Sequence, residues 1–187
     1  FMLEVNFNPF PELHTERLLL RKLALSDKED IFEIRSNAEV MKYMMRPVAK
    51  TVKIAALHIE NVLKNMEGNN GIDWGIVEKK SNKLIGTIAF WRIVKEYYRA
   101  EIGYVLNENW HHKAIMHEAF SAVIPYAFKT LKFHSIEANI DPLNTASAKL
   151  LEKNKFRKEA HYRENLFFEG AFLDSIIYSL VKSIDYN

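Results

Sequence analysis

Apolar residues in the first third of the chain form one short continuous run and then recur at helical spacing. The run at residues 16–23 is flanked by charge and predicts a strand. Ser26 and Asp27 precede a segment with acids in its first turn, which predicts a capped helix. Thr51 can cap a second helix, which ends where glycines and asparagines interrupt the pattern. The apolar face of this second helix is predicted to contain Ile54, Leu57, His58, Val62 and Leu63.

The middle of the chain contains three strand-like runs separated by short polar segments. They lie at residues 74–79, 84–94 and 100–106 and predict an antiparallel meander. Strand alternation places Glu101 and Gly103 on one face of the third run. A carboxylate is therefore expected in the middle of a strand.

The last third predicts two helices and three strands. Residues 114–131 have apolar positions at helical spacing, and Pro125 within them predicts a kink. Residues 134–140 read as a strand of the buried type, and residues 146–154 as a short helix. The tail adds two strands and a turn, at residues 156–168, 172–181 and 169–170.

Composition narrows the class of protein. A chain of 187 residues with 48% hydrophobic and 27% charged residues is expected to fold as one domain. The formal net charge of +2 gives no nucleic-acid footprint, and the lack of cysteine excludes disulfides, thiolate metal sites and a cysteine nucleophile. No apolar run is long enough for a membrane helix, so we expect a cytoplasmic protein without nucleic-acid or membrane partners. Phe1, before Met2, is interpreted as a cloning remnant.

Three stretches, in this order along the chain, resemble a known enzyme family. They are residues 15–21, residues 100–106 running into a helix, and residues 144–158 with Asn144 and Ser147. Together they are similar to the GNAT N-acetyltransferases, and within them to the RimJ/RimL-type branch, which acetylates protein N-termini and related amines. The resemblance implies an α+β fold within about residues 14–182. Its mixed, mostly antiparallel sheet would be splayed between the fourth and fifth strands and flanked by helices, with acetyl-CoA in the opening.

The resemblance also implies where acetyl-CoA binds. Backbone groups of Tyr104, Val105 and Leu106 are expected to pair with the pantetheine arm and polarise the thioester carbonyl, as an oxyanion hole does. The next helix would bind the pyrophosphate with its free N-terminal amides. On this sequence, the family's phosphate-binding loop falls on His111, His112, Lys113, Ala114, Ile115 and Met116.

This loop departs from the family pattern. Ala114 stands where the family has glycine, Met116 where it has glycine or alanine, and His112 where this branch usually has a further glycine. A Cβ forced into the left-handed region costs ~1–2 kcal/mol, whereas Ala114 is harmless if the loop is merely helical. The longer side chain of Met116 is expected to crowd the phosphates. The imidazoles of His111 and His112 and the charge of Lys113 would partly offset these departures, because they place donors and positive charge beside the pyrophosphate. We therefore expect weaker, pH-dependent CoA binding.

Glu101 and Ser147 are the candidate catalytic residues. Acetyl transfer needs a neutral amine and a proton for the departing thiolate. Glu101 acts as a water-linked base, or alternatively points to solvent or pairs with Arg99. Ser147 stands where some members of the branch place the acid, or alternatively its hydroxyl bonds the backbone at the start of a helix. The tyrosine that many GNAT enzymes use one turn later is Leu151 here.

Two other polar sites have simpler interpretations. Asn144 binds the cofactor, caps the helix, or does both. His111, His112 and His117 suggest a metal, but without a helical carboxylate–histidine motif we predict no metal site.

The sequence therefore predicts an acetyl-CoA-dependent N-acetyltransferase that works by direct transfer in a ternary complex, with a protein N-terminal α-amine as acceptor. One alternative is a GNAT-fold binding or regulatory module with a damaged loop, supported by Ala114, Met116 and Lys155, the last at a usual glycine position. Another is an enzyme that acetylates a small amine such as a polyamine or aminoglycoside. The sequence is compatible with a monomer or a homodimer.

Overall fold

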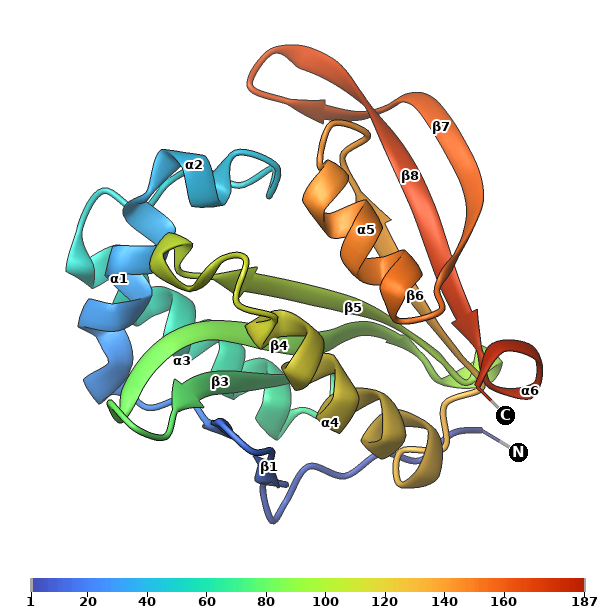
Figure 1. The fold of residues 1–187 in the computed structure, drawn as a ribbon, viewed down its shortest axis with the longest axis horizontal. Helices are drawn as coiled ribbons and strands as arrows, with labels where there is room; N and C mark the ends of the chain where they lie inside the picture. Colours follow the sequence, from blue (N-terminus) through green and yellow to red (C-terminus); the bar gives the residue numbers. More distant parts are fainter. Residues whose placement is uncertain (1, 187) are drawn as a thin grey trace.

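An eight-stranded sheet is the centre of the computed structural model, which describes residues 2–186; Phe1, the predicted cloning remnant, lies outside the described residues (Figure 1). The strand order is β1-β2-β3-β4-β5-β6-β8-β7, and only the β5–β6 pair is parallel. The strands are β1 Leu13–His14, β2 Leu18–Lys22, β3 Ile72–Glu78, β4 Lys83–Val94, β5 Arg99–Leu106, β6 Ser135–Ile140, β7 Arg157–Phe168 and β8 Ala171–Val181. This is the mixed, mostly antiparallel sheet that the sequence predicts.

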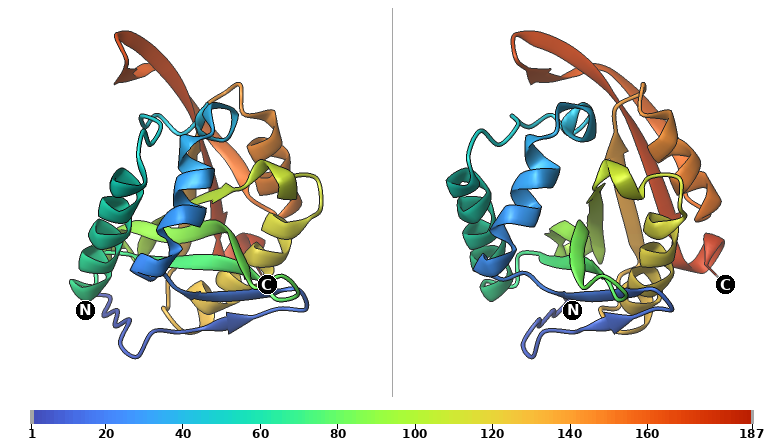
Figure 2. Two further views of the ribbon diagram at one scale, coloured as in Figure 1. Left: turned by 90° about the vertical axis from the view of Figure 1, so that its left-hand side faces the viewer. Right: turned by 60° about the vertical axis from the view of Figure 1, so that its left-hand side comes forward.

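Helices cover both faces of the sheet (Figure 2). The α-helices are α1 Lys28–Ser36, α2 Ala38–Met41, α3 Val52–Glu67, α4 Ile115–Lys129, α5 Thr145–Lys153 and α6 Lys182–Asp185. A large core lies under α4 and α5 and contains the fully buried rings of Trp74, Phe90 and Phe120. A smaller core joins α1 and α3 to the opposite face of β3 and β4. None of the helices in residues 2–186 is long and apolar enough to cross a membrane.

The predicted cap of α3 is confirmed, but its predicted apolar face is partly wrong. Thr51 Oγ1 accepts a hydrogen bond from the Ile54 amide at 3.3 Å. Ile54 and Leu57 are 44% and 48% exposed, whereas Ala55, Ile59 and Met66 are buried. The apolar arc of this helix is wider than the strip that the sheet and α1 can cover, and periodicity alone does not show which edge stays in water.

Asp27 does not cap α1 as predicted. Its carboxylate instead accepts two hydrogen bonds from the Arg21 guanidinium, at 2.8 and 2.9 Å, and one from the Ala24 amide at 2.8 Å. The ion pair ties β2 to the start of α1.

The predicted opening of the sheet is confirmed. β5 and β6 pair only at Arg99–Ser135, Ala100–Ile136 and Glu101–Glu137, and then diverge (Figure 1). The end of β5 stays on β4, because the Asn107 amide donates to the Ile85 carbonyl at 2.8 Å. A Cβ at Gly86 would lie 2.5 Å from the Val105 carbonyl oxygen, so glycine permits this close pairing.

The strand predicted as the buried type alternates instead. In β6, Ile136, Ala138 and Ile140 are buried, whereas the residues between them are half-buried. The buried face packs against the large core, and Ala138, Asn139 and Ile140 at the end of the strand line a cavity beside β5.

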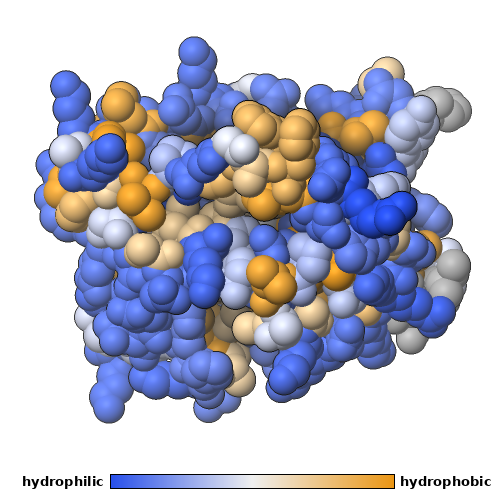
Figure 3. Space-filling model, turned by 90° about the horizontal axis from the view of Figure 1, so that it is seen from above, coloured by the Kyte–Doolittle hydropathy of each residue, from blue (hydrophilic) through white to orange (hydrophobic). Residues whose placement is uncertain are grey.

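The two predicted C-terminal strands are confirmed, and they complete the sheet as the β7–β8 hairpin. Gly170 has a φ of +84° at their turn. Phe167 and Phe172, 65% and 66% exposed, face each other near the tip of the hairpin, and apolar side chains gather there on the surface (Figure 3). α4 runs continuously through Pro125.

The Asp27 contacts predict a pH-dependent contribution to stability. Burial raises the pKa of Asp27, but hydrogen bonds from Arg21 and Ala24 outweigh burial and lower it overall. A lowered carboxyl pKa contributes stability above the unfolded pKa and loses it as the pH falls through the folded pKa. We expect Asp27→Asn to lower the free energy of unfolding at pH 7 by about 2 kcal/mol, measured by urea denaturation.

The difference from wild type should shrink toward the acid end of the titration. Glu60→Gln, which changes an exposed carboxylate of α3, is the control and should have little effect. A difference that is the same at every pH would contradict a role for the charge of Asp27.

Candidate functional site

Two cavities lie on the two sides of the opening between β5 and β6. The sheet cavity, about 540 Å³, is lined by residues 43–47, 91–92, 101–104, 138–140 and 166–168, with Asn144 and Ser147. The loop cavity, about 500 Å³, is lined mainly by residues 104–106, 108, 110–112 and 114–117, with parts of α2 and α5. Both cavities share Tyr43, Met44, Tyr104, Asn144 and Ser147. A molecule in one cavity can therefore meet a molecule in the other at these side chains.

The structure distributes the predicted site residues between the two cavities. Ten of them line the loop cavity: Tyr104, Val105, Leu106, His111, His112, Ala114, Ile115, Met116, Asn144 and Ser147. Glu101 lines only the sheet cavity, and Lys113 lines neither cavity. Lys113 Nζ instead donates to the Asn109 carbonyl at 2.8 Å and lies 5.1 Å from the centre of the Trp110 ring.

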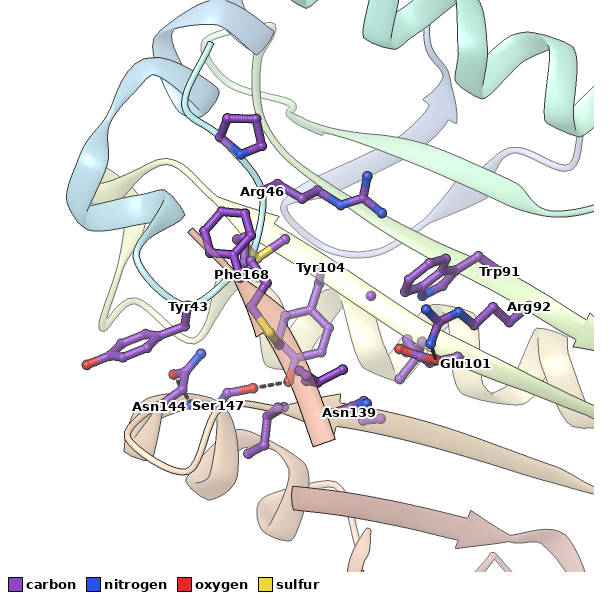
Figure 4. Close-up of a pocket in the computed structure, with 18 of the residues that line it drawn as sticks. Tyr43, Arg46, Trp91, Arg92, Glu101, Tyr104, Asn139, Asn144, Ser147 and Phe168 are labelled. Carbon is purple, nitrogen blue, oxygen red and sulfur yellow. Dashed lines mark hydrogen bonds and ion pairs between the residues drawn. The ribbon is translucent and has the colours of Figure 1, made fainter. Parts of the chain in front are cut away.

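A chain of hydrogen bonds joins β5 to α5 where the cavities meet (Figure 4). Tyr104 Oη and Ser147 Oγ are 2.6 Å apart, and the Ser147 amide donates to Asn144 Oδ1 at 3.1 Å. Asn144 therefore caps α5, as one of its predicted roles requires. The alternative in which the Ser147 hydroxyl bonds the backbone is wrong, because the hydroxyl bonds the phenol.

The side chain of Tyr104 is the functional group that sequence reasoning missed. It packs edge-on against Phe120, 5.0 Å between ring centres, and burial raises the pKa of its phenol despite the bond to Ser147. The phenol is therefore neutral and can donate. The sequence pattern could have identified this side chain, because alternation places Tyr104 on the apolar face of β5, where its hydroxyl needs a polar partner.

Glu101 lies in the sheet cavity with only 13% of its side chain exposed. The expected pairing with Arg99 is wrong: Arg92 binds Glu101 at 3.0 Å, and Arg99 binds Glu137 at 3.0 Å. A β-bulge between Trp91 and Val94 shifts the register and brings Arg92 beside Glu101. Burial raises the pKa of Glu101 although Arg92 opposes the rise, so this carboxylate is more basic than an exposed glutamate.

The backbone of β5 presents polar groups to the opening. The Asn107 amide points to β4, and successive residues of a strand direct their backbone groups to opposite sides. The amides and carbonyls of Leu106 and Tyr104 therefore point toward β6. Val105 points into the ladder with β4 instead. The Leu106 carbonyl accepts from His111 Nε2 at 2.9 Å.

The loop before α4 contains two non-glycine residues in the left-handed region, His112 with φ 60° and Ala114 with φ 57°. The alternative in which Ala114 is merely helical is therefore wrong. Lys155 also adopts φ 67° at its usual glycine position. Met116 is only 7% exposed and packs in the large core, but it also lines the loop cavity, so its crowding of the phosphates stays a prediction.

The helix start leaves donors for an anion. The first amide of α4 with a bond inside the helix is that of Glu118, which donates to the Ala114 carbonyl at 3.0 Å. The amides of Ile115, Met116 and His117 precede it and have no carbonyl to bind within the helix. With the positive end of the helix dipole, they form a site suited to phosphate.

A clamp from the turn between β1 and β2 holds this loop. Arg17 Nη1 donates to the Lys113 carbonyl at 3.0 Å, and Arg17 Nε donates to Glu118 at 2.6 Å. Thr15 Oγ1 donates to the same carboxylate. Thr15 and Arg17 belong to residues 15–21, the first stretch of the family resemblance, and they position the loop.

Within residues 2–186, no three histidine, aspartate or glutamate side chains are grouped as a metal site requires. His117 Nδ1 lies 3.0 Å from Asn154 Oδ1.

Residues 17–157 match a family model described as an acetyltransferase (GNAT) domain. The chain belongs to the GNAT acetyltransferase family. GNAT acetyltransferases take the acetyl group from acetyl-CoA and transfer it to an amine. The predicted family, fold and enzyme class are confirmed, and the chain is an N-acetyltransferase.

Individual relatives support this assignment. The uncharacterized N-acetyltransferase YoaA of Bacillus subtilis (strain 168) is 36% identical over 174 residues, 92% of this chain and 98% of that protein. The crystal structure of a GNAT-family acetyltransferase from Bacillus anthracis has a TM-score of 0.83 and 30% identity, covering 92% of this chain and 99% of that one. The ribosomal protein uS5-alanine N-acetyltransferase of Escherichia coli (strain K12) is 30% identical over 108 residues, 57% of this chain and 56% of that protein.

Because Ala114 of this loop adopts a left-handed conformation, its replacement by glycine is predicted to stabilise the protein. Glycine removes a conformational cost of ~1–2 kcal/mol but adds unfolded-state entropy of ~0.5–1 kcal/mol. We expect Ala114→Gly to raise the free energy of unfolding by about 0.5–1 kcal/mol in urea denaturation. In α4, Ala122→Gly is the matched control and should lower it by about 1 kcal/mol. Destabilisation by both substitutions would contradict the left-handed assignment.

Proposed function

We propose that this enzyme transfers an acetyl group from acetyl-CoA, bound along the loop cavity, to a protein N-terminal α-amine that enters through the sheet cavity. The proposal rests on one observation: two cavities of similar size meet at Tyr104, Asn144 and Ser147. Direct transfer in a ternary complex needs this arrangement, with both substrates present together. Residues of about 14–182 would form the one catalytic domain.

The donor is held by backbone groups and by the helix dipole. The amides of Ile115, Met116 and His117 would bind the pyrophosphate, with His112 beside them. The backbone of Tyr104 and Leu106 would pair with the pantetheine arm in the opening. An amide aimed at the thioester oxygen stabilises the negative charge that develops there.

The chemistry uses groups from both cavities. Glu101 accepts a proton from the ammonium group through water, and the neutral amine attacks the thioester carbonyl to form the C–N bond. The C–S bond then breaks, and Ser147 donates its hydroxyl proton to the departing thiolate while the neutral Tyr104 phenol stays hydrogen-bonded to Ser147. The second proton of the attacking nitrogen, lost as the amide forms, returns to Ser147 through water. An α-amine, with an ordinary pKa of about 7.7–8.0, needs only a modest base. The chain has no cysteine to carry an acetyl intermediate.

The acceptor in this proposal is a protein N-terminus. The partial match to the uS5-alanine acetyltransferase supports this choice. The sheet cavity is open between the 43–47 loop and the β7–β8 hairpin, which suits an extended chain end.

Calorimetry with acetyl-CoA tests the position of the donor. We expect micromolar binding by the wild type, and a loss of about 100-fold in Ala114→Glu, because its carboxylate would face the pyrophosphate. Ala114→Gln matches the size without the charge and should bind within a few-fold of the wild type. The same titration at pH 5 to 8 measures the predicted pH dependence of the loop. Absence of wild-type binding would refute the proposed donor site.

Steady-state kinetics test the proposed acid and base. Ser147→Ala should lower kcat by about 100-fold with little change in acetyl-CoA affinity. Burial raises the pKa of Glu101. As the pH is lowered, kcat/KM should therefore fall at a higher pH than the titration of an exposed glutamate would produce. Glu101→Gln should remove this fall and lower kcat, and an unchanged pH profile in this variant would show that another group is the base.

A further inference from the structure

The end of the sheet cavity away from Ser147 has two arginines around one indole. The guanidinium carbons of Arg46 and Arg92 lie 5.7 and 4.4 Å from the centre of the Trp91 ring (Figure 4). A Cβ at Gly103 would come within 3.3 Å of Trp91 Nε1, so glycine leaves room for the indole on the floor of the cavity. Stacking on an indole orients a planar guanidinium and keeps its hydrogen-bond donors available.

The positive charge of this group is only partly balanced. Arg92 is paired with Glu101 at 3.0 Å. Arg46 has no ion-pair partner among residues 2–186, and it lines the cavity. One cation is therefore free to bind an anion at the cavity wall.

Groups behind the wall do not cancel this charge. The half-buried Arg35 adds a second cation near Arg46, and His58 is neutral because burial and these two arginines lower its pKa to about 4. Asp73 opposes Arg35, but burial raises its pKa to about 7, and its Oδ1 has no hydrogen-bond partner. Burial therefore favours the uncharged form of the carboxylate that would compensate.

The backbone is strained where it presents these side chains. Arg92 has φ 47° at the bulge of β4, and Met45, directly before Arg46, also has φ 47°. Neither is a glycine, so each position costs roughly 1–2 kcal/mol. Strain of this kind persists where the surroundings impose it and is common at ligand-binding sites.

We infer that the acceptor amine carries a carboxylate, as in an acidic N-terminal peptide, and that Arg46 binds this carboxylate beside Trp91. The inference rests on the proposed function and specifies its substrate class. The amine would face the thioester between Ser147 and Glu101, and the acidic side chain would extend toward Arg46 (Figure 4). Arg46 is exposed, so its bond to this carboxylate would provide orientation together with modest affinity.

The same charges act against cationic acceptors. A polyamine or a lysine-rich N-terminus would place an ammonium group beside Arg46, where like charges repel. The positive surroundings also favour the neutral form of the bound amine, which is the nucleophile.

Acetylation of matched peptides tests the inference. Three peptides of equal length would begin Ala-Asp-Glu, Ala-Asn-Gln and Ala-Lys-Lys, and release of the CoA thiol would be followed. We expect kcat/KM to fall about 10-fold from the acidic to the neutral peptide, and further to the basic one. In Arg46→Gln, the acidic-to-neutral ratio should approach one, while Arg46→Lys should keep part of it.

Lys50→Gln, an exposed cation of the same loop, is the control and should leave the ratio unchanged. Equal kcat/KM for all three peptides, preference for the basic peptide or for spermidine, or a ratio unaffected by Arg46→Gln would overturn the inference. Acetylation confined to free aspartate or glutamate would overturn the peptide as the source of the carboxylate. The proposed function fails separately, when the wild type binds no acetyl-CoA or acetylates no amine.

Discussion

The short parallel pairing between β5 and β6 is the constraint on which the rest of the structure depends. Three residue pairs hold the strands together up to Glu101 and Glu137, and β5 then continues along β4 alone. The parting leaves backbone groups of β5 without strand partners and creates a cavity on each side of the sheet. Helices α4 and α5 border the cavity on one side, and the 43–47 loop and the β7–β8 hairpin border the cavity on the other. The Tyr104–Ser147 bond spans the gap and joins the halves of the molecule where the two substrates would meet.

Backbone conformations that glycine usually provides are kept here by other residues. Ala114 and Lys155 adopt the left-handed region although each carries a Cβ, and the Arg17 clamp on Lys113 and Glu118 helps to hold the first of these turns. The helix start therefore still offers its amides to an anion. A departure from a sequence motif need not change the geometry when tertiary contacts outweigh ~1–2 kcal/mol of local strain.

The two cavities differ in chemical character. The loop cavity offers backbone amides and a helix dipole, which recognise phosphate in any molecule that carries it. The sheet cavity offers arginines, an indole and a basic carboxylate, whose effect depends on the charge of the acceptor. Within one family, the donor side is thus set mainly by backbone geometry, and the acceptor side by side chains on loops and strand ends.

The sequence by itself determined the order and type of nearly all the elements, because hydrophobic spacing and turn residues act locally. It also determined the family, the opening of the sheet and the candidates Glu101, Ser147 and Asn144. Tertiary structure alone decided which partners these residues have: Arg92 rather than Arg99 for Glu101, and the Tyr104 phenol for Ser147. It likewise decided that Met116 turns into the core and that Ile54 and Leu57 stay in water. These outcomes depend on strand register, a bulge and helix coverage, which arise from contacts between residues far apart in the chain and leave no mark on local spacing.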